Sequence, residues 1–223
     1  MKRYMYSGFL EDYRLHQDFI TEYSILKQAR DIKLKHVISL NNILLGVDHA
    51  AITMQKLEMD LRTYLRKYRD FRQLNRIMGI VVEGLMELHS IGYVHRDLKP
   101  ENIVLNLKPL DVKIIDFNRA IPMSVTTKGH VRGTEGYFPE NENIRDGSTK
   151  WDIWALAVII LEADMEIDEY FSVKDERSSK RKVFEHFNRE QTCKHLKVLL
   201  RRTLLVPKIE EMMSIDDLIA ELT

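Results

Sequence analysis

The sequence predicts an α+β fold with two unequal lobes, a small lobe of strands and one helix followed by a larger and mostly helical lobe. Two observations support this prediction. Before residue 60, short β-leaning segments accompany one amphipathic helix, and after it helical periodicity dominates. At 223 residues, the chain is long enough for one large domain or for a small lobe joined to a larger one.

The first half of the chain contains the clearest periodic patterns. Apolar residues recur at three-to-four-residue spacing over residues 15–30, which predicts a helix. Residues 37–45 and 50–57 are short β-leaning segments separated by a GVDH turn, which predicts an antiparallel pair of strands. An apolar stripe predicts one long helix over residues 61–90, ended by the Ile91-Gly92 break.

After residue 93 the pattern changes to short strands, NIVLN and VKIIDF, which flank a turn at KPLD. Residues 118–150 lack sustained periodicity, and long segments of this kind in compact domains are usually functional. Residues 151–163 are apolar on all sides, which predicts a buried helix. Further helices are predicted near residues 194–205 and 214–222, with KDERSSKRK as a solvated loop.

Composition excludes several classes of partner. The chain has 34 basic and 34 acidic residues, so no net charge attracts it to nucleic acid or to an anionic membrane. The longest apolar run, residues 155–161, is too short to cross a bilayer. The single cysteine, Cys193, has no intramolecular disulfide partner, which fits a reducing compartment. We therefore expect an intracellular protein, cytoplasmic or nuclear, without nucleic-acid or membrane partners.

Residues 95–102 read HRDLKPEN, which matches the HRDxxxxN catalytic-loop pattern of protein kinases. The chain thus resembles the eukaryotic-type protein kinases, and the LKPEN form resembles their serine/threonine-directed members. Asp152 and Trp154 match the family's DxW motif, in which a buried aspartate accepts hydrogen bonds from the catalytic-loop backbone. The resemblance implies a bilobal kinase fold that transfers the γ-phosphoryl group of ATP, with Mg²⁺, to a protein substrate.

Phosphoryl transfer requires positioning and charge neutralisation, and five residues match family positions that supply both. By resemblance, Asp97 orients the acceptor hydroxyl and takes its proton, and Lys99 places an ammonium beside the phosphate. Asn102 and Asp116 would hold Mg²⁺ through hard oxygen ligands. Thr134, in a segment similar to the GTxxYxxPE anchor, would contact both Asp97 and Lys99. The alternatives are a hydrogen-bonded structural loop and, for Thr134, a turn residue with a local bond.

Two features of the predicted activation segment, residues 116–140, depart from the family pattern. Asn118 replaces the glycine of Asp-Phe-Gly, and asparagine is one of the few other residues that tolerate positive φ. Met212 stands where the family has an arginine that pairs with Glu140. We expect Glu140 to be reached by solvent, paired with another base, or protonated, and docking of this segment to be weak.

A regulatory hypothesis concerns Arg96, which precedes the catalytic aspartate. Its guanidinium could hold a phosphate on Ser124, Thr126 or Thr127 and so order the segment. The alternative is that these three are exposed loop hydroxyls.

No glycine-rich loop precedes Lys2 in this sequence, so we expect a reduced N-terminal lobe, the alternative being a true start upstream of Met1. By resemblance, Lys2 is the strand lysine that contacts the ATP phosphates, and Glu22 is the helix glutamate that pairs with it. The alternatives are an exposed terminal lysine and a solvated helix residue. Kinases with a minimal upper lobe and short loops resemble those of large DNA viruses.

The segment after the predicted strand pair resembles the kinase hinge. Met54 falls at the gatekeeper position, and Gln55 to Leu57 would hydrogen-bond adenine through their backbone. Asp60 would accept a ribose hydroxyl, or alternatively cap the following helix.

Two functions remain open from the sequence. The first is a serine/threonine protein kinase with lobes at residues 1–57 and 58–223. The second is a kinase mimic that binds and inhibits a partner kinase, for example through an open edge of the reduced sheet.

Overall fold

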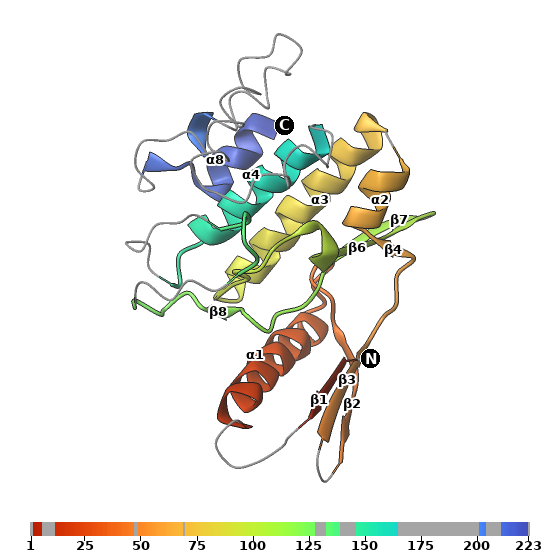
Figure 1. The fold of residues 1–223 in the computed structure, drawn as a ribbon, viewed down its shortest axis with the longest axis vertical. Coiled ribbons are helices and arrows are strands. Elements are labelled where there is room, and N and C mark those ends of the chain that lie inside the picture. The colour runs from red at the N-terminus through yellow and green to blue at the C-terminus, as the bar shows by residue number, and fades with distance from the viewer. Residues whose placement is uncertain are drawn as a thin grey trace.

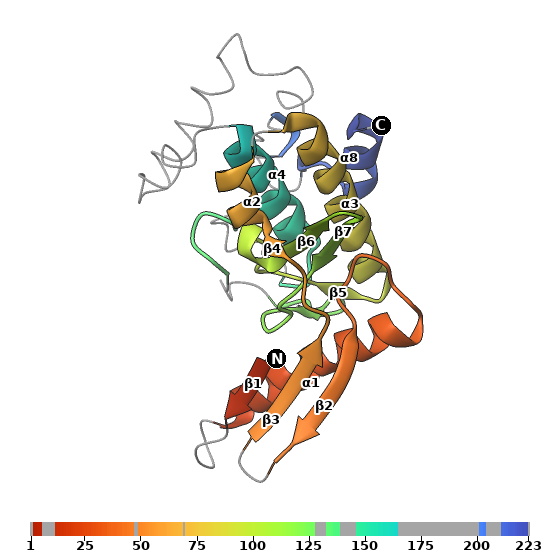
Figure 2. The same ribbon diagram turned by 90° about the vertical axis from the view of Figure 1, so that its right-hand side faces the viewer.

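The computed structural model describes residues 2–5, 12–46, 49–68, 70–127, 133–138, 146–164, 201–203 and 211–222. These residues form the predicted α+β fold in two unequal lobes (Figure 1). The small lobe consists of β1, α1, β2 and β3, and the elements from β4 onward form the large lobe (Figure 2).

The small lobe is a three-stranded antiparallel sheet with one helix. Its strands β1 (Lys2–Met5), β2 (Leu40–Leu45) and β3 (His49–Met54) lie in the order β1-β3-β2. The helix α1 (Asp12–Asp31) lies along the sheet in both ribbon views and buries Ile25, Leu26 and Ala29. The predicted helix and the predicted antiparallel pair are therefore confirmed.

The lobes are joined tightly through residues 35–38. The Glu87 carboxylate accepts hydrogen bonds from the backbone N–H groups of Lys35, His36 and Val37 at 2.7–3.1 Å. Val37 forms an isolated parallel bridge to Ile114 instead of extending β2. The segment that follows α1 is thus fixed to the large lobe by both a side chain and a strand.

After β4, the large lobe has two helices where the sequence predicted one. Helices α2 (Leu61–Lys67) and α3 (Phe71–Ser90) are separate, so the prediction of a continuous helix over residues 61–90 is wrong. Tyr68 has extended dihedrals, φ −126° and ψ 139°, and ends α2. The Asp70 side chain accepts hydrogen bonds from the N–H groups of Arg72 and Gln73, so it caps a new helix.

The rest of the large lobe positions the catalytic segments. Strands β4 (Met59–Asp60), β6 (Ile103–Leu107) and β7 (Leu110–Ile114) form one small sheet, and β5 (Tyr93–Val94) pairs with β8 (Ile121–Pro122). The 3₁₀ helix η1 (Pro100–Asn102) precedes β6. Helix α4 (Lys150–Asp164) is buried, as its apolar sequence predicted, and α8 (Ile215–Leu222) confirms the last predicted helix.

Several predictions fall outside the described residues. They concern Cys193, Glu140, the KDERSSKRK loop and most of the helix expected near residues 194–205. Met212 is described and packs in the hydrophobic core. Within the described part of the chain, no helix has the length and apolar character needed to span a bilayer.

Candidate active site

Asp152, in the first turn of α4, holds the catalytic loop in place. Its carboxylate, fully buried, accepts hydrogen bonds from the backbone N–H groups of His95 and Arg96 at 2.9 Å and contacts His89 Nε2 at 2.8 Å. Burial alone would raise the pKa of Asp152, but these interactions with His89 and His95 hold it below its usual value. The predicted contact of the DxW aspartate with the loop backbone is present.

His95 joins the loop to the segment that contains Asp116. Its Nε2 contacts the carbonyl oxygen of Ile115 at 2.9 Å, and its Nδ1 accepts the Asp97 N–H at 3.2 Å. A neutral ring with the proton on Nε2 satisfies both contacts. The ring also packs against Phe117, with centroids 5.3 Å apart. One histidine therefore couples the positions of Asp97 and Asp116.

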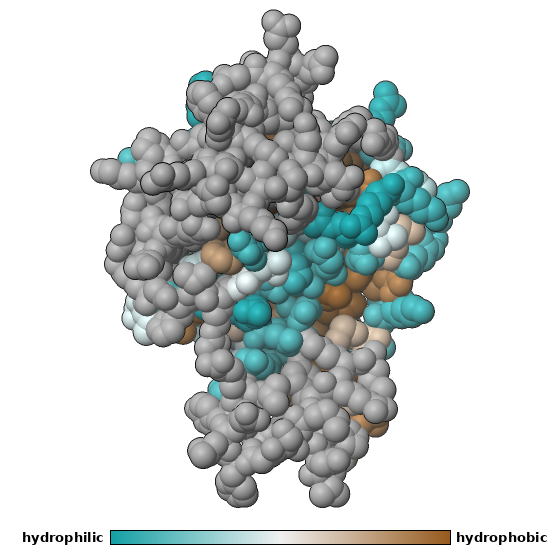
Figure 3. All heavy atoms as spheres, viewed as in Figure 1, coloured by the Kyte–Doolittle hydropathy of each residue, from teal (hydrophilic) through white to brown (hydrophobic). Residues whose placement is uncertain are grey.

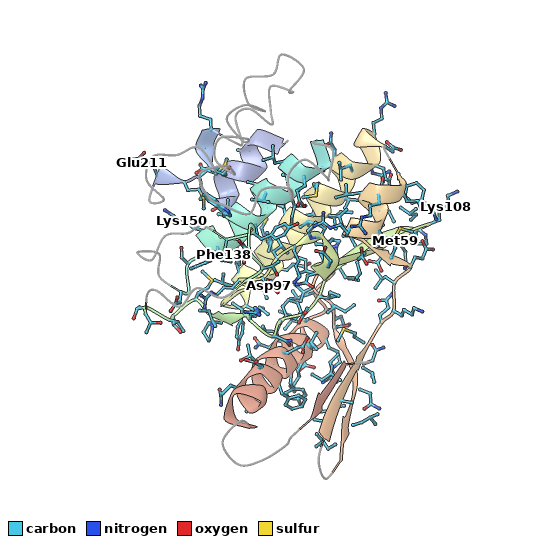
Figure 4. The ribbon with its side chains drawn as sticks, in the orientation of Figure 1. Met59, Asp97, Lys108, Phe138, Lys150 and Glu211 are labelled. Carbon is cyan, nitrogen blue, oxygen red and sulfur yellow. The ribbon has the colours of Figure 1, made fainter. Side chains whose placement is uncertain are left out.

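Asp97 lies near the level at which the two lobes meet (Figure 4). Its Oδ1 accepts a hydrogen bond from Thr134 Oγ1 at 2.7 Å, and Lys99 Nζ lies 3.3 Å from its Oδ2. Lys99 Nζ also donates to Thr134 Oγ1 at 2.8 Å. The structure thus joins three of the predicted site residues in one triangle of hydrogen bonds.

A second cation approaches Asp97, and sequence reasoning missed it. Arg119 Nε lies 3.9 Å from Asp97 Oδ2, and the Arg119 side chain is half-exposed. The signal that could have identified Arg119 is its position three residues after Asp116, in a segment expected to be functional. Hydrophilic residues gather across the middle of the face drawn in Figure 3, near the level at which Figure 4 labels Asp97.

The two predicted Mg²⁺ ligands lie on adjacent backbone segments. Asn102 is buried at the end of η1, and its carbonyl oxygen accepts the Ile115 N–H, one residue before Asp116. The Asn102 Nδ2 donates to the Asp97 carbonyl oxygen at 2.8 Å, so the amide oxygen is the atom suited to a hard cation. Among the described residues, no group of three or more His, Cys, Asp or Glu side chains forms a metal cluster. An amide and a carboxylate oxygen fit Mg²⁺, which keeps several water ligands.

Positive φ occurs at two non-glycine residues of the site, Arg96 at 63° and Asp116 at 66°. This conformation costs roughly 1–2 kcal/mol per residue and is concentrated at functional sites. The positive φ that asparagine was expected to tolerate at position 118 is therefore found at Asp116 instead.

The predicted ATP-contacting residues of the small lobe are only partly described. Glu22 is fully buried on α1, so the alternative of a solvated helix residue is wrong. The backbone of Lys2 lies in β1 opposite Ile52, but its side chain is outside the described residues. The Lys2 to Glu22 pair therefore stays a prediction.

The predicted hinge connects β3 to β4. Met54 ends β3, Gln55 is exposed, and Leu57 is buried. Asp60 Oδ1 accepts the Thr63 N–H at 2.7 Å, which confirms its alternative role as the cap of α2. Contacts of these residues with adenine or ribose stay predictions.

A buried ionic cluster, which the sequence did not reveal, holds the end of the activation segment. The Tyr137 hydroxyl donates to the Glu162 carboxylate at 2.8 Å, and Arg62 contacts both Tyr137 and Glu162. Arg62 Nε also pairs with Glu101 Oε1 at 2.8 Å. Burial raises the pKa of Tyr137, and the negative charge of Glu162 adds to this. The cluster ties the activation segment to α2 and α4.

Comparison with known proteins agrees with this geometry. The family model described as the protein kinase domain matches residues 7–220. The chain is similar to a dual specificity protein kinase YAK1 homolog of Arabidopsis thaliana, with 30% identity over 158 residues. The similar part covers 66% of this chain but only 16% of that protein. With its catalytic loop, activation segment and bilobal fold, the chain belongs to the eukaryotic-type protein kinase family.

Proposed function

We propose that this chain is a serine/threonine protein kinase that transfers the γ-phosphoryl group of ATP to a hydroxyl of a protein substrate. The observation that supports this most is the triangle of Asp97, Lys99 and Thr134, with distances of 2.7, 2.8 and 3.3 Å. A carboxylate held by a hydroxyl and an ammonium is oriented and charge-balanced, as transfer to a hydroxyl requires.

In the proposed reaction, Asp97 takes the proton of the acceptor hydroxyl. The acceptor oxygen forms a bond to the γ-phosphorus while the bond between that phosphorus and the leaving ADP oxygen breaks. Lys99, whose Nζ lies 3.3 Å from Asp97 Oδ2, offsets negative charge at the transferred group. Mg²⁺, when bound by Asn102 and Asp116, supplies further charge neutralisation at the phosphates.

The choice of acceptor residue is the finer part of the proposal. The LKPEN sequence at residues 98–102 favours serine and threonine, whereas the Arabidopsis relative is named as dual specificity. Phosphoamino-acid analysis of a mixed peptide library, phosphorylated with γ-labelled ATP and Mg²⁺, tests this directly. We expect phosphoserine and phosphothreonine. Phosphotyrosine in comparable amount would indicate dual specificity instead.

A kinase mimic that binds a partner kinase is the second candidate. The observation that favours it is the exposure of two leucines on β2, an outer strand of the small-lobe sheet, where Leu44 is 49% and Leu45 is 75% exposed. A thermal unfolding measurement with and without ATP and Mg²⁺ separates the candidates, because a ligand of the folded state raises the midpoint. We expect an increase. No shift together with no phosphoryl transfer would favour the mimic.

We also keep the proposed division into lobes at residues 1–57 and 58–223. It falls between β3 and β4, in the segment proposed to contact adenine.

A further inference from the structure

Arg96 is held by the first turn of α4 and by the segment that precedes this helix. Its backbone N–H donates to Asp152, and its guanidinium lies over the Trp151 ring, 4.8 Å from the centroid. Its Nη2 lies 3.4 Å from Asp146 Oδ1, and both side chains are almost fully buried, with 2% and 3% exposure. In this buried pair the two opposite charges stabilise each other, because removing one partner of a buried ion pair is costly.

Asp146 in turn contacts the activation segment. Its Oδ2 accepts a hydrogen bond from Thr127 Oγ1 at 2.6 Å, and its N–H donates to the Thr127 carbonyl oxygen at 2.8 Å. The next residue, Gly147, donates to the Val125 carbonyl oxygen at 3.2 Å. A Cβ at Gly147 would lie 2.7 Å from the carbonyl oxygens of Met123 and Val125, so glycine permits this close approach. Residues 125–127 are therefore joined to residues 146–147 by backbone and side-chain bonds.

We propose that Asp146 is a positioning residue that holds Arg96, and through it the loop carrying Asp97, so that phosphoryl transfer does not depend on a phosphate in the activation segment. The proposal rests on the proposed kinase function. The Asp146 carboxylate lies against the Arg96 guanidinium, the group predicted from the sequence to hold a phosphate on Ser124, Thr126 or Thr127. It also carries the hydrogen bond that orders Thr127.

The surroundings of Thr127 support the same conclusion. Its hydroxyl already donates to Asp146, so a phosphate on Thr127 would replace that donor with a dianion beside a carboxylate. The like charges would repel, and the phosphate would compete with Asp146 for Arg96. The Ser124 and Thr126 side chains are exposed, and phosphates there are not needed to neutralise Arg96. We expect a Ser124→Ala, Thr126→Ala double variant to transfer phosphate at the wild-type rate.

The test compares four preparations of the full chain with the untreated wild type, using γ-labelled ATP. Wild-type protein treated with phosphatase should retain its rate within about twofold. Asp146→Asn should reduce kcat at least about tenfold, because it removes the negative charge that holds the buried Arg96 guanidinium in place. Asp111→Asn, which removes a partly exposed ion pair with Lys113, is the matched control and should retain the wild-type rate. Exchanging the two side chains, Thr127→Asp with Asp146→Thr, returns a carboxylate to the same cluster and should recover most of the rate.

Each result supports or overturns the proposal. Phosphatase treatment that abolishes an initially active enzyme overturns it, as does a fully active Asp146→Asn. An exchange variant that folds but stays as slow as Asp146→Asn also overturns it, since the charge would then not matter. If the untreated wild-type chain transfers no phosphate, the proposed function fails instead. Amide hydrogen exchange of the unphosphorylated chain then decides the inference: slow exchange at Asp146 and Gly147, lost in Asp146→Asn, supports it, and fast exchange in the wild type overturns it.

Discussion

Glu162 makes the free energy of unfolding depend on pH, and this dependence can be measured. Its buried carboxylate accepts the Tyr137 hydroxyl at 2.8 Å and lies 3.4 Å from Arg62. Burial raises the pKa of Glu162 from 4.5 to about 7, and attraction to Arg62 offsets this only in part. Because the unfolded chain ionises at the lower pKa, the free energy of unfolding falls as pH rises from about 4.5 to about 7. At 1.36 kcal/mol per pKa unit, the fall is about 3 kcal/mol.

Glu162→Gln keeps the size of the side chain and removes its titration. We expect its unfolding free energy, measured by urea denaturation between about pH 5 and pH 8, to lack this fall. Glu101→Gln is the matched control, because Glu101 pairs with the same guanidinium but is half-exposed. The control should keep the pH dependence of the wild type. If Glu162→Gln and the wild type have equal slopes against pH, the reasoning about this buried carboxylate is refuted.

Two further predictions concern the site and the junction of the lobes. Thr134→Ala removes the hydroxyl that bridges Asp97 and Lys99, so kcat for phosphoryl transfer should fall about tenfold, an effect of roughly 1.4 kcal/mol, while Thr134→Ser retains most of it. Equal rates for the two variants would argue against the bridge. Glu87→Gln leaves one oxygen to accept three backbone N–H groups, so urea denaturation should show a loss of about 1–3 kcal/mol. Glu83→Gln, exposed on the same helix, should change stability little, and a similar loss there would contradict this account.

The parts of the protein that could be predicted from sequence are those whose motif or periodic pattern lies within one short segment. The catalytic loop is eight contiguous residues, and the periodicity of α1 and α4 is contained within each helix. The break between α2 and α3 was missed because the apolar stripe continues across it. The competing signal was Asp70. Its backbone is extended and its side chain caps α3, so a new helix starts there instead of α2 continuing.

The ionic contacts around the site could not be predicted, because they join residues that are distant in the chain. Arg96 and Asp146 are 50 positions apart, and Arg62 and Glu162 are 100 positions apart. No periodicity or spacing rule relates such pairs. The packing of α2 near α4 brings Arg62 to Glu162, and the packing of the catalytic loop against the segment before α4 brings Arg96 to Asp146. Asp60 shows the converse: its position before a helix permitted two roles, and the structure establishes the local one.

The central claim, that Asp97 serves phosphoryl transfer, is tested most directly by comparing the wild type with Asp97→Asn. Initial rates of label transfer from γ-labelled ATP to a serine-containing protein substrate should fall on the order of 10²-fold or more in the variant. The increase in thermal midpoint caused by ATP and Mg²⁺ should persist, which would show that the nucleotide still binds. Equal transfer by both proteins would contradict the account.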